Sequence, residues 1–139
     1  MNPWHRVRMI LNFVNLSTPL GLLIAAAGGC TVRSAADGLH LACGYRIPFP
    51  LAPAFTVGNV VIYRDADEFD GRPGLLGHEA RHSTQYAWCA GLPMLPLYVL
   101  SAGVSLILSG DPASYNPFER LAGLTAGGYE QRGLWFLRR

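Results

Sequence analysis

The stretch GLLGHEARHSTQYAW, residues 74–88, contains two histidines four residues apart, with a glutamate directly after the first. If this stretch is a helix, His78 and His82 project from the same face, one turn apart. Two imidazoles at that spacing can hold one Zn²⁺ ion, and Glu79 is then the neighbour that can accept a proton from a water molecule at the metal. The alternative is a helix with a solvated face of histidine, glutamate and arginine and no metal.

Length and composition indicate one small domain with an apolar surface. Of the 139 residues, 50% are hydrophobic and only 14% are charged, against about 25% charged in typical soluble domains. So few charges cannot cover a surface, which favours contact with membrane lipid or a protein partner. All basic residues are arginine, the net charge is +2 and no basic run is interleaved with aromatics, so nucleic acid is not expected as a partner.

Residues 1–29 are expected to be a retained membrane anchor. Residues 9–27 are mostly apolar and about long enough to span a bilayer, but asparagines and a proline interrupt them. A single span therefore competes with two short helices joined by a kink, the second starting at Thr18 and Pro19. A signal peptide is a third option, because residues 27–30 faintly resemble a lipoprotein cleavage site.

The segment after the anchor changes to a β pattern. CTVRSAADGLHLACGYR predicts a hairpin with its turn at residues 35–38. In that register Cys30 and Cys43 face each other, which fits either a disulfide or two small buried residues. Residues 54–64 are rich in β-branched side chains and predict one further strand. In many HExxH proteins a strand lies beside the helix that carries the histidines, and residues 54–64 are the candidate for it.

Three helices are expected in the remainder of the chain. The polar residues 65–74 predict a surface loop. It precedes the helix expected over residues 74–88, called the metal helix below, whose Gln85 lies on the same face as the two histidines. Residues 90–109 carry no charge and are again about long enough to span a bilayer. Asn116, followed by a proline, predicts the start of a third helix near 116–127.

A family resemblance suggests the third metal ligand. HEARHSTQY, then an apolar helix with prolines, then NPFERLA resembles the pattern of small bacterial membrane-associated HExxH proteins of gluzincin-like zinc-metallopeptidase type. The resemblance extends over about residues 54–122. It implies that His78, His82 and Glu119 are zinc ligands and that Glu79 is the general base.

A zinc ion shared by these three ligands requires all of them on one side of any membrane. We therefore expect residues 94–109 to form a helical hairpin with the metal helix, packed against it or half-embedded in the bilayer, so that Glu119 returns to within about 5 Å of the imidazoles. Gluzincins often carry an aspartate after the distal glutamate, which this chain lacks. Tyr86 and Tyr129 are the candidates to stabilise an oxyanion.

Together these patterns predict an α+β fold. A membrane-anchor helix or kinked helix pair (1–29) precedes one metallopeptidase-like domain (30–139), made of a small β-hairpin or meander and three helices carrying the HExxH site and distal glutamate. The expected function is hydrolysis of peptide or protein substrates by a membrane-associated zinc metallopeptidase. The alternative is a non-catalytic accessory subunit of a larger membrane complex. The resemblance implies a bacterial cell membrane; Arg6 and Arg8 favour a cytoplasmic N-terminus, with the metal site on the extracytoplasmic side.

Overall fold

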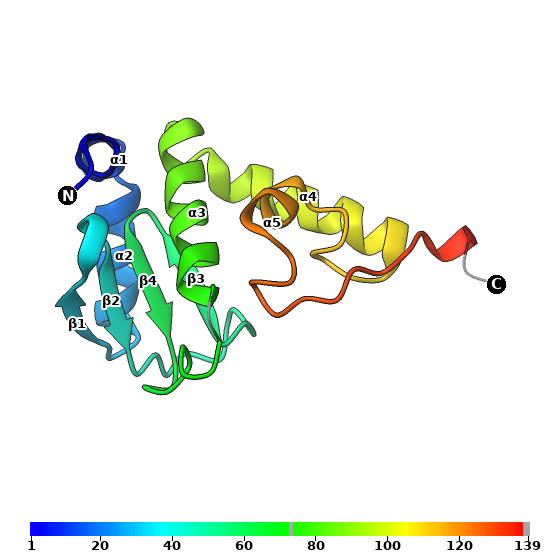
Figure 1. The fold of residues 1–139 in the computed structure, drawn as a ribbon, viewed down its shortest axis with the longest axis horizontal. Coiled ribbons are helices and arrows are strands. Elements are labelled where there is room, and N and C mark those ends of the chain that lie inside the picture. Colours follow the sequence, from blue (N-terminus) through cyan, green and yellow to red (C-terminus); the bar gives the residue numbers. More distant parts are fainter. Residues whose placement is uncertain (73, 138–139) are drawn as a thin grey trace.

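A sheet of four short strands, with helices packed against it, organises the N-terminal two-thirds of the chain (Figure 1). The computed structural model describes residues 1–72 and 74–137. The fold is α+β, with five α-helices in the described residues. In chain order the elements are α1 (Pro3–Val14), α2 (Ser17–Ala27), β1 (Thr31–Ser34), the short 3₁₀ turn η1 (Ala36–Gly38), β2 (His40–Cys43), β3 (Ala54–Val57), β4 (Val60–Tyr63), α3 (Leu75–Trp88), α4 (Met94–Ser109), α5 (Pro117–Ala122) and η2 (Trp135–Leu137).

The sheet is sandwiched between α2 and α3. Its strand order is β1-β2-β4-β3, with antiparallel pairs at both edges and a parallel pairing of β2 with β4 in the centre. Side chains alternate along β4: Val60 and Ile62 pack against α2, whereas Val61 and Tyr63 lie on the opposite face. The metal helix α3 lies against the edge strand β3, as predicted from the sequence.

The predicted strand over residues 54–64 was wrong in one respect, because two strands and a tight turn occupy it. Val57 pairs with Val60, so Gly58 and Asn59 form a two-residue hairpin connection, and Gly58 has a positive φ of 62°. A Cβ at Gly58 would overlap the backbone at the start of α2. The turn is therefore fixed both by backbone conformation and by its close approach to a helix.

The predicted register of the first hairpin was wrong by one residue. Cys43 pairs with Thr31, not with Cys30, and both cysteines are free thiols. Asp37 and Gly38 both have positive φ, of 62° and 74°, so the turn takes up one more residue than the predicted one. Of the two interpretations of this pair, the disulfide is not formed, and both thiols are half-buried.

The N-terminal segment is a kinked helix pair, one of the arrangements considered from the sequence. Leu16 has a φ of 71°, and the Asn15 side chain accepts a hydrogen bond from the Ser17 amide at 3.0 Å, which starts α2 in a new direction. The two helices are bent by 72°. Among the described residues, no single helix has the length and hydropathy of a membrane span, although the bent pair does when taken together.

A buried polar network ties this helix pair to the metal helix. The Asn12 amide nitrogen donates to Asn59 Oδ1 at 2.9 Å and to the Ser83 carbonyl at 2.8 Å. The Ser83 hydroxyl donates to the same Asn59 oxygen at 2.6 Å. Both asparagines are fully buried, so each bond replaces one that water would otherwise supply. One hydrogen-bonded network thus joins α1, the β3–β4 turn and α3 beside His82.

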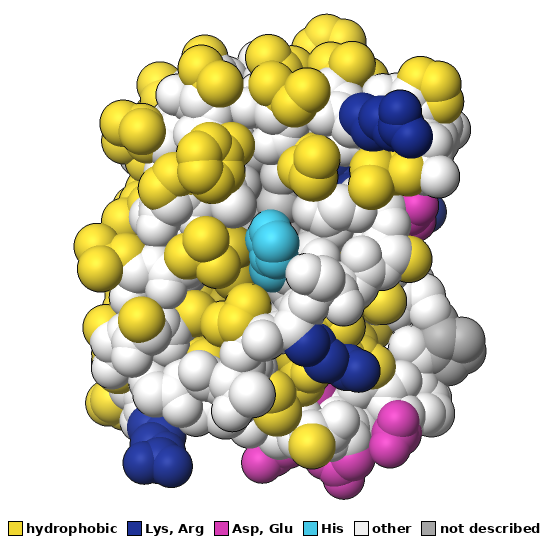
Figure 2. Space-filling view, turned by 90° about the vertical axis from the view of Figure 1, so that its left-hand side faces the viewer, with side chains coloured by type: hydrophobic (Ala, Val, Ile, Leu, Met, Phe, Trp, Pro, Cys, Tyr) yellow, Lys and Arg dark blue, Asp and Glu magenta, His cyan; other side chains and the backbone are white. Residues whose placement is uncertain are grey.

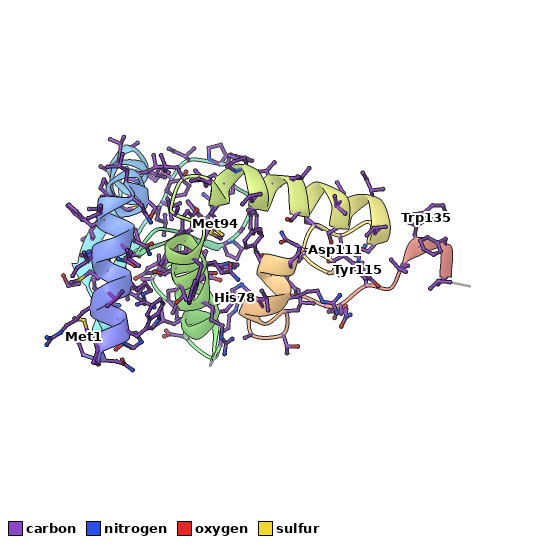
Figure 3. All side chains as sticks on the ribbon, turned by 90° about the horizontal axis from the view of Figure 1, so that it is seen from above. Met1, His78, Met94, Asp111, Tyr115 and Trp135 are labelled. Atoms are coloured by element: carbon purple, nitrogen blue, oxygen red, sulfur yellow. The ribbon has the colours of Figure 1, made fainter. Side chains whose placement is uncertain are left out.

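Helix α4 does not form the expected antiparallel hairpin with α3. It runs away from the sheet, crosswise to α3, and projects to one side of the molecule (Figures 1 and 3). Only its first turns reach the metal helix, through a cluster that includes Tyr86, Met94 and Tyr98. The chain then folds back through residues 110–116 so that α5 packs against α3.

Asn12→Ala should lower the free energy of unfolding by about 2–3 kcal/mol, because it leaves buried acceptors without their donor. Chemical denaturation followed by circular dichroism measures this change. Val14→Ala, on the exposed face of the same helix, is the matched control and should change stability by no more than about 0.5 kcal/mol. An equally small effect of Asn12→Ala would contradict the role of the network.

Candidate metal centre

The structure brings His78 and His82 together on one face of α3, as their spacing predicts, and that face is turned towards α5. Both rings are buried, with centroids 4.7 Å apart, and their Nε2 atoms lie 3.1 Å from each other. The other two histidines are elsewhere: His5 pairs with Asp37 at 2.8 Å, and His40 lies in β2.

Glu119 completes the group from α5. Its Oε2 lies 3.1 Å from His78 Nε2 and 3.3 Å from His82 Nε2, within the distance expected from the sequence. Asn116 caps this helix by accepting the Phe118 amide at 3.0 Å, with a proline at the first position, as predicted. The helix ends earlier than predicted, at Ala122, because Gly123 turns the chain with a φ of 98°.

Hydrogen bonds on the far side of each imidazole determine where its lone pair points. His78 Nδ1 lies 2.8 Å from the Gly123 carbonyl, and His82 Nδ1 lies 2.8 Å from Gln85 Oε1. Both partners are acceptors, so each Nδ1 carries the proton and each Nε2 keeps a bare lone pair. The Gln85 amide is itself oriented, since its nitrogen donates to the Phe118 carbonyl at 2.8 Å.

Three electron-rich atoms therefore face one another in a buried space. With both Nδ1 atoms donating, Glu119 Oε2 is buried without a hydrogen-bond partner. The Tyr98 hydroxyl donates to the other oxygen of this side chain, Oε1, and so stabilises the ionised carboxylate. Mutual repulsion of two lone pairs and one carboxylate is relieved by a cation between them. The residues fit a metal ion.

Glu79 lies beside this group but points to a different partner. Its Oε2 accepts a hydrogen bond from the Thr56 hydroxyl of β3 at 2.6 Å, and the side chain is buried. Burial raises the pKa of Glu79, although His82 and the bond from Thr56 act in the opposite direction. A carboxylate with a raised pKa, next to but outside the ligand group, is suited to accept a proton.

Tyr98 is a functional contact that sequence reasoning missed. Its hydroxyl donates to Glu119 Oε1, the oxygen that does not face the histidines. Of the two tyrosines singled out from the sequence, Tyr129 has its ring 6.1 Å from that of His78, whereas Tyr86 is packed into the core between α3 and α4. A tyrosine on an uncharged helix was the signal for Tyr98 in the sequence.

A cavity of about 240 Å³ opens onto the group. Its polar lining includes the two histidines, Glu79, Glu119, Thr56 and three tyrosines, and the rest is apolar. A second hollow, on the side of residues 125–129, shares five lining residues with it: Ala52, Ala54, Glu79, Tyr98 and Tyr129. Glu79 can therefore be reached from two directions. The apolar walls of the first cavity include Phe49, Phe55, Met94, Leu95 and Val99.

Gln85→Ala should weaken metal binding about 10–100-fold, because the His82 ring loses the acceptor that fixes its tautomer and orientation. Competition with a chromogenic chelator measures the affinity. Gln131→Ala, at an exposed position, is the control and should leave the affinity unchanged. Equal affinities in both variants would contradict the orienting role of Gln85.

Gly127→Ala should also reduce metal affinity, on the order of tenfold or more. A Cβ at this position would lie 2.5 Å from His78 Cε1, so the ring or the segment covering it must move. Gly77→Ala places the same methyl group in open space, one residue before His78, and should if anything stabilise the helix. Unchanged affinity in Gly127→Ala would show that residues 123–128 do not hold the ring.

The two imidazoles and the carboxylate form a buried group that could bind a metal ion. All three residues were singled out from the sequence, and the fold brings them together from two helices. Comparisons of the chain with known family models, with characterised proteins and with solved structures found no match. The chemistry of the site therefore has to be inferred from its own atoms.

Proposed function

We propose that this protein is a membrane-associated zinc metallopeptidase that hydrolyses peptide bonds. One observation carries the proposal: His78 Nε2, His82 Nε2 and Glu119 Oε2 converge within 3.3 Å of one another, and the carboxylate of Glu79 lies beside them in the same cavity. The resemblance of HEARHSTQY and NPFERLA to gluzincin-like proteins supports the same assignment.

The donor set is what favours zinc. Two imidazole nitrogens and one carboxylate oxygen are a ligand set that catalytic zinc sites use, with a fourth position left for water or substrate. The first cavity lies on the open side of the group and provides that room. Bound there, zinc would polarise a peptide carbonyl and make a neighbouring water molecule more acidic.

The chain's own residues divide the remaining work. Glu79 takes a proton from the attacking water as the new C–O bond forms at the carbonyl carbon. It returns that proton to the amide nitrogen as the C–N bond breaks, so the products are a carboxylic acid and an amine. Thr56 holds the Glu79 carboxylate in place. Tyr129, which lines both hollows, is in position to donate to the carbonyl oxygen as negative charge develops there.

A non-catalytic accessory subunit of a membrane complex is the second candidate. It is favoured by the many large apolar side chains exposed on α1 and α4, which suit burial against another protein as well as against lipid. Metal analysis of the purified protein separates the candidates: about one zinc per chain supports the peptidase, and folded protein free of metal supports the subunit. In both cases we place the protein at a bacterial cell membrane, with the buried group on the extracytoplasmic side.

Glu79→Gln should abolish peptide hydrolysis while metal content and folding remain those of the unmodified protein, because Glu79 moves a proton and is not a ligand. Hydrolysis of a fluorogenic peptide, zinc content and circular dichroism are measured on the same preparation. Glu130→Gln makes the same chemical change at an exposed position and should retain full activity. Full activity of Glu79→Gln would exclude the mechanism.

A further inference from the structure

After Met94, which packs in the core, helix α4 turns hydroxyl groups inward and apolar side chains outward, the reverse of a helix in a soluble domain. Its inward side carries hydroxyl groups: Tyr98 donates to Glu119, and Ser105 and Ser109 donate to the Asp111 carbonyl at 2.6 and 3.1 Å. Its outward side carries an apolar stripe at helical spacing. The members of this stripe and their exposures are Leu97 46%, Leu100 66%, Val104 46% and Ile107 74%.

Aromatic residues flank this exposed stripe along the chain. Trp88, just before α4, is 76% exposed, and Trp135, which lies beyond the far end of α4, is 61% exposed (Figure 3). Tryptophan is enriched where a membrane meets water, since its ring is apolar and its N–H is polar. No aspartate, glutamate, lysine, arginine or histidine occurs between residues 90 and 109. An uncharged helix with an exposed apolar stripe and flanking tryptophans is suited to contact with the apolar part of a lipid leaflet.

The loop that forms the other rim of the cavity has the same character. Phe49 and Leu51 are both largely exposed, and Arg46 at the start of this loop is exposed as well. The loop is held by Arg64, which donates to the Ile47 and Pro50 carbonyls at 2.7 and 2.6 Å. Its apolar tip is therefore fixed in an exposed position, with a cation beside it that can pair with lipid phosphate.

The cavity on the metal group is continuous with these surfaces. Phe49 from the loop and Leu95 and Val99 from α4 line it, and Val99 is also exposed. Figure 2 faces the other side of the molecule, away from α4, and shows acidic side chains mostly at its lower edge and hydrophobic ones over its upper and left parts. The apolar rim of the cavity, formed by the loop and α4, thus leads to the metal group.

We propose that the outer face of α4 and the tip of the 46–51 loop lie in one lipid leaflet, so that the site receives its substrate from the bilayer. That substrate is an apolar segment of a membrane-bound polypeptide, with a large apolar side chain seated in the cavity. The inference rests on the proposed peptidase function and adds the partner surface and the substrate class to it.

Vesicles of phosphatidylcholine and phosphatidylglycerol test the surface. The full chain should sediment with them. The double variant Leu100→Glu, Ile107→Glu should bind on the order of a hundredfold more weakly, because binding would place two carboxylates in the apolar phase. Val32→Glu makes the same change on β1, at the other side of the molecule, and should bind like the unmodified protein. Undiminished vesicle binding by the double variant would overturn the proposal. The proposal would also be overturned if the unmodified protein did not bind vesicles but self-associated, and the double variant did not self-associate.

Hydrolysis tests the substrate class and separates it from the peptidase function. The double variant alters neither the metal group nor the cavity lining, so it should keep its zinc and cleave a soluble peptide normally. It should cleave a leucine-rich peptide embedded in the same vesicles at least about tenfold more slowly than the unmodified protein does. Equal rates on the embedded peptide would overturn the lipid-side delivery and leave the peptidase function standing. If the unmodified protein contained no zinc and hydrolysed neither peptide, the proposed peptidase function itself would be refuted.

Two soluble peptides that differ by one leucine-to-serine exchange test the cavity. Burial of a leucine side chain should favour the leucine peptide by about 10–100-fold in kcat/KM. Equal kcat/KM values would overturn the assignment of an apolar substrate side chain to the cavity, without bearing on lipid binding.

Discussion

The structure depends on holding together three buried atoms that repel one another. His78 Nε2, His82 Nε2 and Glu119 Oε2 lie 3.1–3.3 Å apart, and burial strengthens every electrostatic interaction between them. Such a group persists only if the chain on each side of it is firmly held. The surroundings supply that hold: the Gly123 carbonyl, the Gln85 amide and the Tyr98 hydroxyl each fix one member from outside. The scaffold is built to keep the group intact and open on one side.

The supports of the group come from the whole length of the chain. The edge strand β3 holds Glu79 through Thr56, and the N-terminal helix reaches the back of α3 through Asn12. Even Arg8 is buried, donating to the Asp37 carbonyl at 2.6 Å and to the Ala80 carbonyl at 3.4 Å. Residues that read in the sequence as part of a membrane anchor therefore also pack against the metal helix. A membrane role for the first 29 residues remains a prediction, and their packing role is additional to it.

The sequence predicted α3 and α4 closely and the local turns poorly. Helical spacing of His78 and His82, and the uncharged run up to Ser109, are strong local signals, and both helices lie where they were expected. Both hairpin turns depend on positive φ angles, at Gly58 in one and at Asp37 and Gly38 in the other. Glycine, asparagine and aspartate all adopt such angles, so residue type alone does not fix the length of a turn. The direction of α4 could not be read from the chain, because its inward hydroxyls find their partners only after residues 111–115 fold against them.

Glu119 lies next to His82 although 36 intervening residues, including all of α4, separate them in the chain. An ion held by both would close this long loop in the same way as a covalent cross-link, and its effect would fall mainly on the unfolded chain, whose conformational entropy it reduces. The metal would then be a part of the protein's architecture as much as of its chemistry. A chain of this size, with a helix that turns its leucines outward, gains most from such a closure, because its own core is small.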